Sequence, residues 1–152
     1  MSTFDPAALL YEYTLDVTGV TEYGVTLASL ASGQPPPPEG ARLDVWFAGA
    51  AASGHRLSGS VKGADYLCVR ADGRFDLHIH AEITTDNGGK ISLSADGIAI
   101  PRPGTPIFEL RENARLFTSV PEYRWVNPLQ IWGVGTVDLA KQVIHIKGYS
   151  AA

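Results

Sequence analysis

The chain has 152 residues, of which 45% are hydrophobic and 18% charged, which is typical of one soluble globular domain with a sizeable core. Its net charge is −4 and its Lys and Arg residues are scattered, so no basic stripe is present and we expect no nucleic-acid partner. No apolar run approaches the roughly 20 residues that a membrane-spanning helix needs, so we expect no membrane association.

Two features indicate the cellular compartment. The opening residues, MSTFDPAALL, lack the basic and then apolar pattern of a secretion signal. The single cysteine, Cys68, leaves no partner for an intramolecular disulfide. Both features predict a cytoplasmic protein. Cys68 lies between Leu67 and Val69, a position typical of a small buried hydrophobe.

Alternating or β-branched segments, separated by Gly, Pro and Asp-Gly or Asn-Gly pairs, follow one another along the chain and predict ten strands. Tight hairpins are expected at RADGRF and TTDNGGKI, because Asp-Gly and Asn-Gly tolerate the positive φ of primed turns. We therefore predict one all-β domain over residues 1–152, an antiparallel meander closed into a barrel, since closure removes exposed edges. The predicted strands are Leu9–Val17, Tyr23–Leu30, Ala41–Ala51, His55–Val61, Asp65–Arg70, Arg74–Thr85, Lys90–Ile100, Phe108–Ser119, Leu129–Asp138 and Gln142–Tyr149.

Two stretches interrupt this pattern. ASGQPPPPEG contains four consecutive prolines, which favour an extended segment: either a stiff loop or a ligand for a peptide-recognition domain. SVPEYRWVNPLQIW combines aromatic and polar residues between two prolines and predicts an ordered loop. That loop either contacts a ligand at the barrel mouth or caps the barrel end, with Trp125 as a plug and Asn127 bound to backbone.

Three blocks of the chain carry a resemblance to a known family: GHRLSGSVKGADYLCVRADG, IHAEITTDNGGKISLSADG and LFTSVPEYRWVN. Through them the chain resembles a bacterial family of uncharacterised proteins, DUF3237 (the UPF0311 proteins). The family pattern has Trp where this chain has Tyr66, and Leu where it has Val126. The resemblance implies a β-barrel of about ten antiparallel strands. It implies little about activity, and a fold alone does not supply a reaction.

The stretch FDLHIHAEITTD carries the candidate chemistry. His78 and His80 lie on the same face of a strand, about 7 Å apart. With Glu82, and with His145 recruited from elsewhere, they could hold a metal, but the spacing fits known metal-binding barrels poorly. We therefore favour a site without metal or cofactor. In that site His78 and His80 are the candidate base and acid, and Asp65 and Glu82 orient or tune them.

The same alternation fits a second interpretation. One face of a soluble antiparallel sheet is normally wet and charged, and this slightly favours an outward orientation of the His78 face. The inward orientation is the alternative, because a barrel of this size could enclose a small ligand. The expected ligand contacts are Tyr66, Tyr123, Trp125, Asn127, Arg56 and Trp46. Tyr11, Tyr13 and Trp132 are further aromatic residues that could hold a flat ligand, although core packing is the commoner role.

No nucleophile elbow, phosphate-binding loop or dinucleotide fingerprint is present, which argues against a nucleotide-dependent enzyme. The sequence favours a barrel that binds a small aromatic or apolar organic molecule. One hypothesis is a cofactor-independent acid–base enzyme, such as an isomerase, cyclase, lyase or hydratase. The alternatives are a non-catalytic carrier and a structural subunit, and we expect a homo-oligomer.

Overall fold

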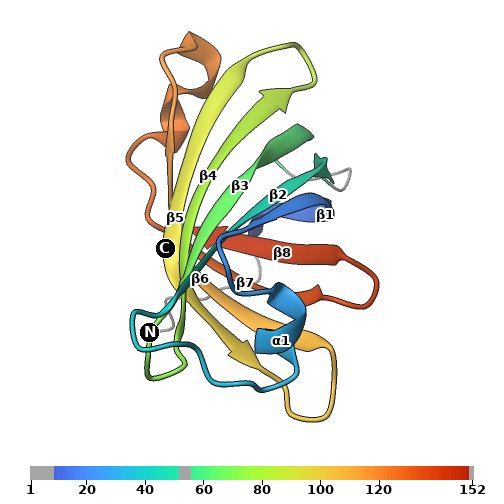
Figure 1. Ribbon diagram of the computed structural model, residues 1–152. Helices are drawn as coiled ribbons and strands as arrows, with labels where there is room; N and C mark the ends of the chain where they lie inside the picture. Colours follow the sequence, from blue (N-terminus) through green and yellow to red (C-terminus); the bar gives the residue numbers. More distant parts are fainter. Residues whose placement is uncertain (1–8, 52–55, 151–152) are drawn as a thin grey trace, which may run out of the picture.

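The computed structural model describes residues 9–51 and 56–150, which form one closed antiparallel barrel with neighbouring strands paired in sequence order. The all-β meander is therefore confirmed, with eight strands in place of ten (Figure 1). The strands are β1 (Leu9–Glu22), β2 (Ala41–Ala51), β3 (Gly59–Val69), β4 (Phe75–Thr85), β5 (Lys90–Pro101), β6 (Ile107–Phe117), β7 (Ile131–Asp138) and β8 (Val143–Ser150).

Two expected strand boundaries are wrong for local reasons. The expected strands His55–Val61 and Asp65–Arg70 are two parts of one strand, β3, which begins at Gly59 and ends at Val69; His55 lies outside the described ranges. Gly63 continues the strand: a Cβ there would lie 2.3 Å from the His80 carbonyl oxygen, so this glycine marks a close approach of backbones. The expected strand Tyr23–Leu30 contains the short helix α1 (Leu27–Ala31), because Thr26 caps it by accepting from Ser29 N.

The hairpin turns form where the sequence predicts them. Gly73 and Gly88 have φ of 92° and 89°, and each donates its N–H back across the turn, to Arg70 and Thr85 respectively. Glycine is favoured at such positions because a Cβ is strained at positive φ. Both turns join strands without a register shift, so the alternation of side chains between the two barrel faces runs from β3 through β5.

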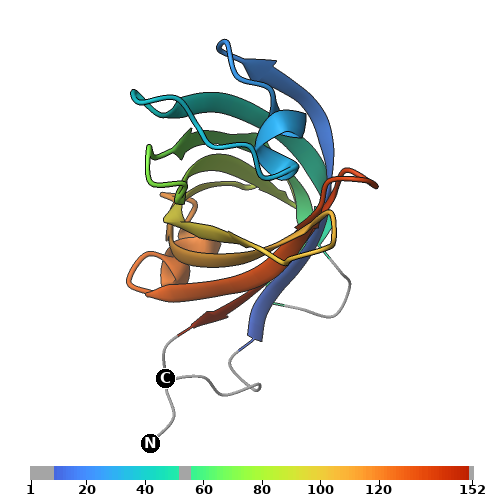
Figure 2. The same ribbon diagram turned by 60° about the horizontal axis from the view of Figure 1, so that its bottom comes forward.

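The two barrel ends differ. At one end lie α1, the proline-rich loop and the β7–β8 connection; at the other, the β4–β5 hairpin and the 3₁₀ helix η2 (Pro121–Val126) (Figure 1). Viewed toward the first end, the strands encircle the interior and α1 lies beside the opening (Figure 2). No helix among the described residues is long and apolar enough to cross a membrane.

Candidate functional site

The barrel interior holds a cavity of about 120 Å³ that reaches the end where α1 and the β7–β8 connection lie. Leu27 of α1, Leu139 and Gln142 line it at that end. An apolar cavity of roughly 150 Å³ holds benzene, so this interior has room for about one small ring. Most of its lining is aliphatic or Phe, as expected for a small-molecule site with a few polar groups.

Two carboxylic acids break this apolar lining, Asp65 on β3 and Glu112 on β6. Glu112 is buried and Asp65 is half-buried, and both residues line the cavity. None of the described residues that line the cavity is Lys, Arg or His, so neither carboxyl has a cation beside it in the interior. Burying an unpaired carboxylate is costly, and the neutral form is favoured instead.

The environment of the two acids raises their pKa values toward neutral pH. Burial, together with the nearby charge of Asp65, raises the pKa of Glu112 to about 7. Burial also raises the pKa of Asp65 to about 6, although the hydrogen bond from the His78 backbone N–H opposes this. A carboxyl that titrates near pH 7 is suited to give and take protons.

Asp65 is held by a local break in the β3–β4 ladder. Its Oδ1 accepts the His78 backbone N–H at 2.9 Å. The paired positions stop at Asp65 and Ile79 and resume at Cys68 and Asp76 without a change of register. The carboxylate therefore satisfies a strand N–H, and His78 contributes to the site through its backbone.

Glu112 and Tyr11 share one cross-strand row separated by two glycines. Glu112 pairs with Gly133, Gly133 with Gly148, and Gly148 with Tyr11. A Cβ on Gly148 would lie 2.3 Å from Tyr11 Cζ, and one on Gly133 would lie 3.3 Å from Glu112 Oε1. The glycines leave room for the Tyr11 ring over β8 and for the Glu112 carboxyl beside β7.

Tyr13 adds an unsatisfied hydroxyl to this wall. Its ring stacks on that of Tyr11, with centroids 4.5 Å apart and planes at 11°, and both residues line the cavity. Tyr13 is 2% exposed, and its hydroxyl has no hydrogen-bond partner among the described residues. Burial raises the pKa of Tyr13 well above its usual value, so the hydroxyl keeps its proton and remains a donor.

The face that carries the two histidines lies on the outer wall. His78 and His80 are exposed and Glu82 is partly exposed, where its carboxylate lies near Lys62 and Lys90. The outward orientation of His78, His80 and Glu82 is therefore confirmed and the inward orientation is wrong, because the apolar residues that alternate with them on β4 face the interior. None of His78, His80 and Glu82 lines the cavity, so their expected catalytic role inside the barrel is excluded. No group of three or more His, Cys, Asp or Glu side chains in the described ranges could hold a metal ion.

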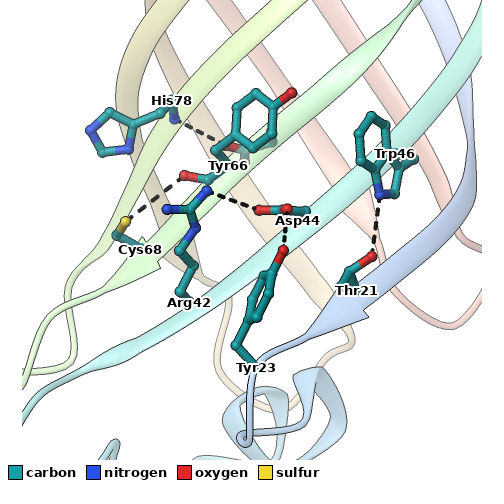
Figure 3. A network of polar contacts seen from close by, with 9 residues as sticks. Thr21, Tyr23, Arg42, Asp44, Trp46, Tyr66, Cys68 and His78 are labelled. Atoms are coloured by element: carbon teal, nitrogen blue, oxygen red, sulfur yellow. Dashed lines mark hydrogen bonds and ion pairs between the residues drawn. The ribbon is translucent and has the colours of Figure 1, made fainter.

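Two of the expected ligand residues, Tyr66 and Trp46, belong to the same outer wall. Tyr66 packs against Trp46, with ring centroids 6.2 Å apart, and lies near His80. Arg42 lies over the Tyr66 ring and pairs with Asp44, which also accepts the Tyr23 hydroxyl (Figure 3). Neither Tyr66 nor Trp46 lines the cavity.

The other four expected ligand residues gather at the barrel end occupied by η2. Arg56 lies 3.9 Å from the Trp125 ring centroid, and the Tyr123 hydroxyl donates to Asn87 of the β4–β5 turn. Asn127 accepts from Thr118 N and donates to Thr118 O, both at 2.9 Å. None of the four lines the cavity. The segment therefore matches the capping interpretation.

Replacing Asn127 with Ala should lower the free energy of unfolding by about 2 kcal/mol, because two partly buried backbone groups lose their partner. Thermal unfolding should then shift down by roughly 4–8 °C for a chain of this length. Asn113→Ala on the outer wall is the control; it removes a hydrogen bond from the exposed Gln130 side chain and should cost less than about 1 kcal/mol. Unchanged stability in the Asn127 variant would contradict the capping role.

Sequence reasoning missed Glu112, although a signal was present. In β6 the interior phase reads Phe108, Leu110, Glu112, Ala114 and Leu116, so one acid interrupts an apolar row. Asp65 interrupts the interior phase of β3 in the same way. One charged residue among the inward-facing positions of a strand indicates a functional site more strongly than several charged residues on its solvent-exposed face.

The fold and the interior site define a closed antiparallel barrel with an acidic, mostly apolar cavity. The model of the family described as "Protein of unknown function (DUF3237)" matches residues 18–150, so this chain belongs to that family. No curated protein matches the sequence.

Solved structures share the fold at low sequence identity. A β-barrel-like protein from Acinetobacter baumannii AYE is 21% identical, with a TM-score of 0.75 over 95% of this chain and 94% of its own. A protein of unknown function from Clostridium acetobutylicum ATCC 824 is 19% identical, with a TM-score of 0.76 over 95% and 97%. A protein from Penicillium herquei, described as an enzyme, is 18% identical, with a TM-score of 0.58 over 93% and 92%.

Proposed function

We propose that this protein is a cofactor-independent acid–base catalyst that acts on a small, mostly apolar organic molecule inside its barrel. The observation that carries the proposal is the pair Asp65 and Glu112 in an apolar cavity that has no cationic residue in its described lining. In this proposal Glu112 transfers the proton, and burial, together with the charge of Asp65, sets the pH at which it does so. A protein of the same fold from Penicillium herquei is described as an enzyme, so the architecture is compatible with catalysis.

A probe reaction tests this role without knowledge of the natural substrate. In cyclopentanone, a single ring of the size that the cavity admits, a base removes a C–H proton beside the carbonyl, the C–H electrons move to the carbonyl oxygen, and the carbon then takes a deuteron from D2O, which NMR detects. A carboxylate in an apolar site is an effective base for this step because it is poorly solvated. The reaction needs no cofactor, and the proton taken by Glu112 returns to water.

We expect saturable turnover of this probe, with a rate that rises with pH through about 7 as Glu112 loses its proton. Glu112→Gln should lower the rate at least about 100-fold. Glu109→Gln is the matched control, since Glu109 lies on the same strand, in the opposite phase, and pairs with Arg102. Equal rates in the wild type and the Glu112 variant would contradict the assignment of Glu112 as the base.

A non-catalytic carrier is the second candidate, favoured by the mostly apolar lining and the absence of histidine from its described residues. A carrier would bind cyclopentanone without accelerating this proton exchange. Calorimetric titration of the Asp65→Asn, Glu112→Gln double variant separates the two functions. Retained binding with lost turnover supports the catalyst, and retained binding with no turnover in the wild type supports the carrier.

A further inference from the structure

We propose that the ligand of this cavity is an uncharged molecule with a carbonyl or other acceptor oxygen that receives a hydrogen bond from the Tyr13 hydroxyl. This inference rests on the proposed function and names its substrate class. It begins from Tyr13, which lines the cavity and whose hydroxyl is buried and has no partner among the described residues. Buried polar groups are nearly always hydrogen-bonded, so one without a partner calls for an explanation.

The chemistry of the hydroxyl selects an acceptor. Because burial keeps its proton in place, the phenol offers a donor and would direct it at an oxygen of the ligand. Tyr11 links this donor to the acid pair, since it stacks on Tyr13 and its own pKa is raised by burial and by the nearby charge of Glu112. A ligand oxygen held by Tyr13 would therefore lie in the same interior as Glu112.

The charge of the cavity excludes anions. Asp65 and Glu112 are its acids, and no described lining residue is a cation, so a carboxylate ligand would meet like charge in an apolar medium. An uncharged ketone or aldehyde avoids that cost. If Glu112 removes a proton from a carbon beside the carbonyl, the electrons move toward the oxygen, and the Tyr13 hydrogen bond strengthens as that charge develops.

The inference is tested with one-ring probes in protein-observed NMR titrations at pH 7. Benzaldehyde and styrene share size and planarity, but styrene has a methylene group in place of the carbonyl oxygen. We expect benzaldehyde to bind the wild type roughly tenfold more tightly than styrene, as expected for one hydrogen bond. Benzoate should bind at least about tenfold more weakly than benzaldehyde.

Tyr13→Phe should remove the preference, so that benzaldehyde and styrene bind equally, while styrene affinity stays within about twofold of the wild type. Tyr23→Phe, which removes an outer-wall hydroxyl bound to Asp44, should leave the preference unchanged. Equal binding of the two probes to the wild type, a preference that survives in Tyr13→Phe, or tighter binding of benzylammonium than of benzaldehyde would each overturn the inference. If no probe binds, the cavity is not a ligand site and the proposed function fails too; equal binding refutes the ligand class alone.

Discussion

Replacing Glu112 with Gln should remove one of the two buried-carboxyl contributions, those of Glu112 and Asp65, that make the stability of the barrel depend on pH. The pKa of the Glu112 carboxyl is about 7 in the folded chain, against an ordinary value of 4.5, so the folded state binds more protons than the unfolded state between these values. Stability therefore falls as pH rises from about 4.5 to 7 and stays low above it. Glutamine cannot ionise, and this part of the pH dependence should disappear.

The expected size follows from the shift. A displacement from 4.5 to about 7 corresponds to about 3 kcal/mol. For a chain of this length that is roughly 6–12 °C in the midpoint of thermal unfolding. The measurement is the difference in midpoint between wild type and Glu112→Gln at about pH 5 and at about pH 8, because effects of surface carboxylates cancel in that difference. Glu109→Gln supplies the baseline for a surface acid on the same strand.

Parallel curves of midpoint against pH for wild type and Glu112→Gln would show that Glu112 does not carry the proton. The coupling to Asp65 gives a second check. Because the Asp65 charge raises the pKa of Glu112, Asp65→Asn should move the remaining Glu112 transition to lower pH. Asparagine retains an oxygen that can accept the His78 N–H, so the strand contact is preserved in this variant.

The barrel could be predicted from the sequence because its determinants are local. Turn glycines such as Gly73 and Gly88, and alternating apolar residues between them, specify hairpins and faces without distant information. The strand count was too high by two, because α1 forms within the expected strand Tyr23–Leu30 and because β3 was divided near Gly63. The true role of Gly63, a close approach to the His80 carbonyl across the β3–β4 pair, depends on tertiary structure.

The site was harder to predict because it is assembled from positions distant in sequence. Asp65 was predicted as a site residue, but as a partner of His78 and His80. Those histidines are concentrated on β4, and they lie on its solvent-exposed face. Glu112 lies 47 positions after Asp65, and its significance depends on barrel closure bringing β3 and β6 around one interior. The sequence is sufficient to predict which residues of each strand face the interior. It is not sufficient to predict that no cation among the described lining residues lies beside the two acids.

Replacing Gly148 with Ala should strongly lower the stability of the barrel. Gly148→Ala would place a Cβ 2.3 Å from Tyr11 Cζ, 2.5 Å from Cε1 and 2.7 Å from Cε2, so the buried ring must move. We expect a loss of about 1–3 kcal/mol, or roughly 2–12 °C in the unfolding midpoint, reduced slightly because Ala is favoured over Gly in a strand. Gly133→Ala should cost less, because its closest contact would be 3.1 Å, to Glu112 Cβ.

A double-mutant cycle identifies the ring as the cause. In a Tyr11→Leu background the space over Gly148 is no longer filled by an aromatic ring, so adding Gly148→Ala should cost less than about 0.5 kcal/mol. The same cost in both backgrounds would mean that the glycine serves the β8 backbone rather than Tyr11. If the cycle shows coupling, Gly148 provides the space that the Tyr11 ring occupies in the interior. The missing side chains at Gly148 and Gly133 then leave space along one cross-strand row, and the Tyr11 phenol and the Glu112 carboxyl occupy it beside the cavity.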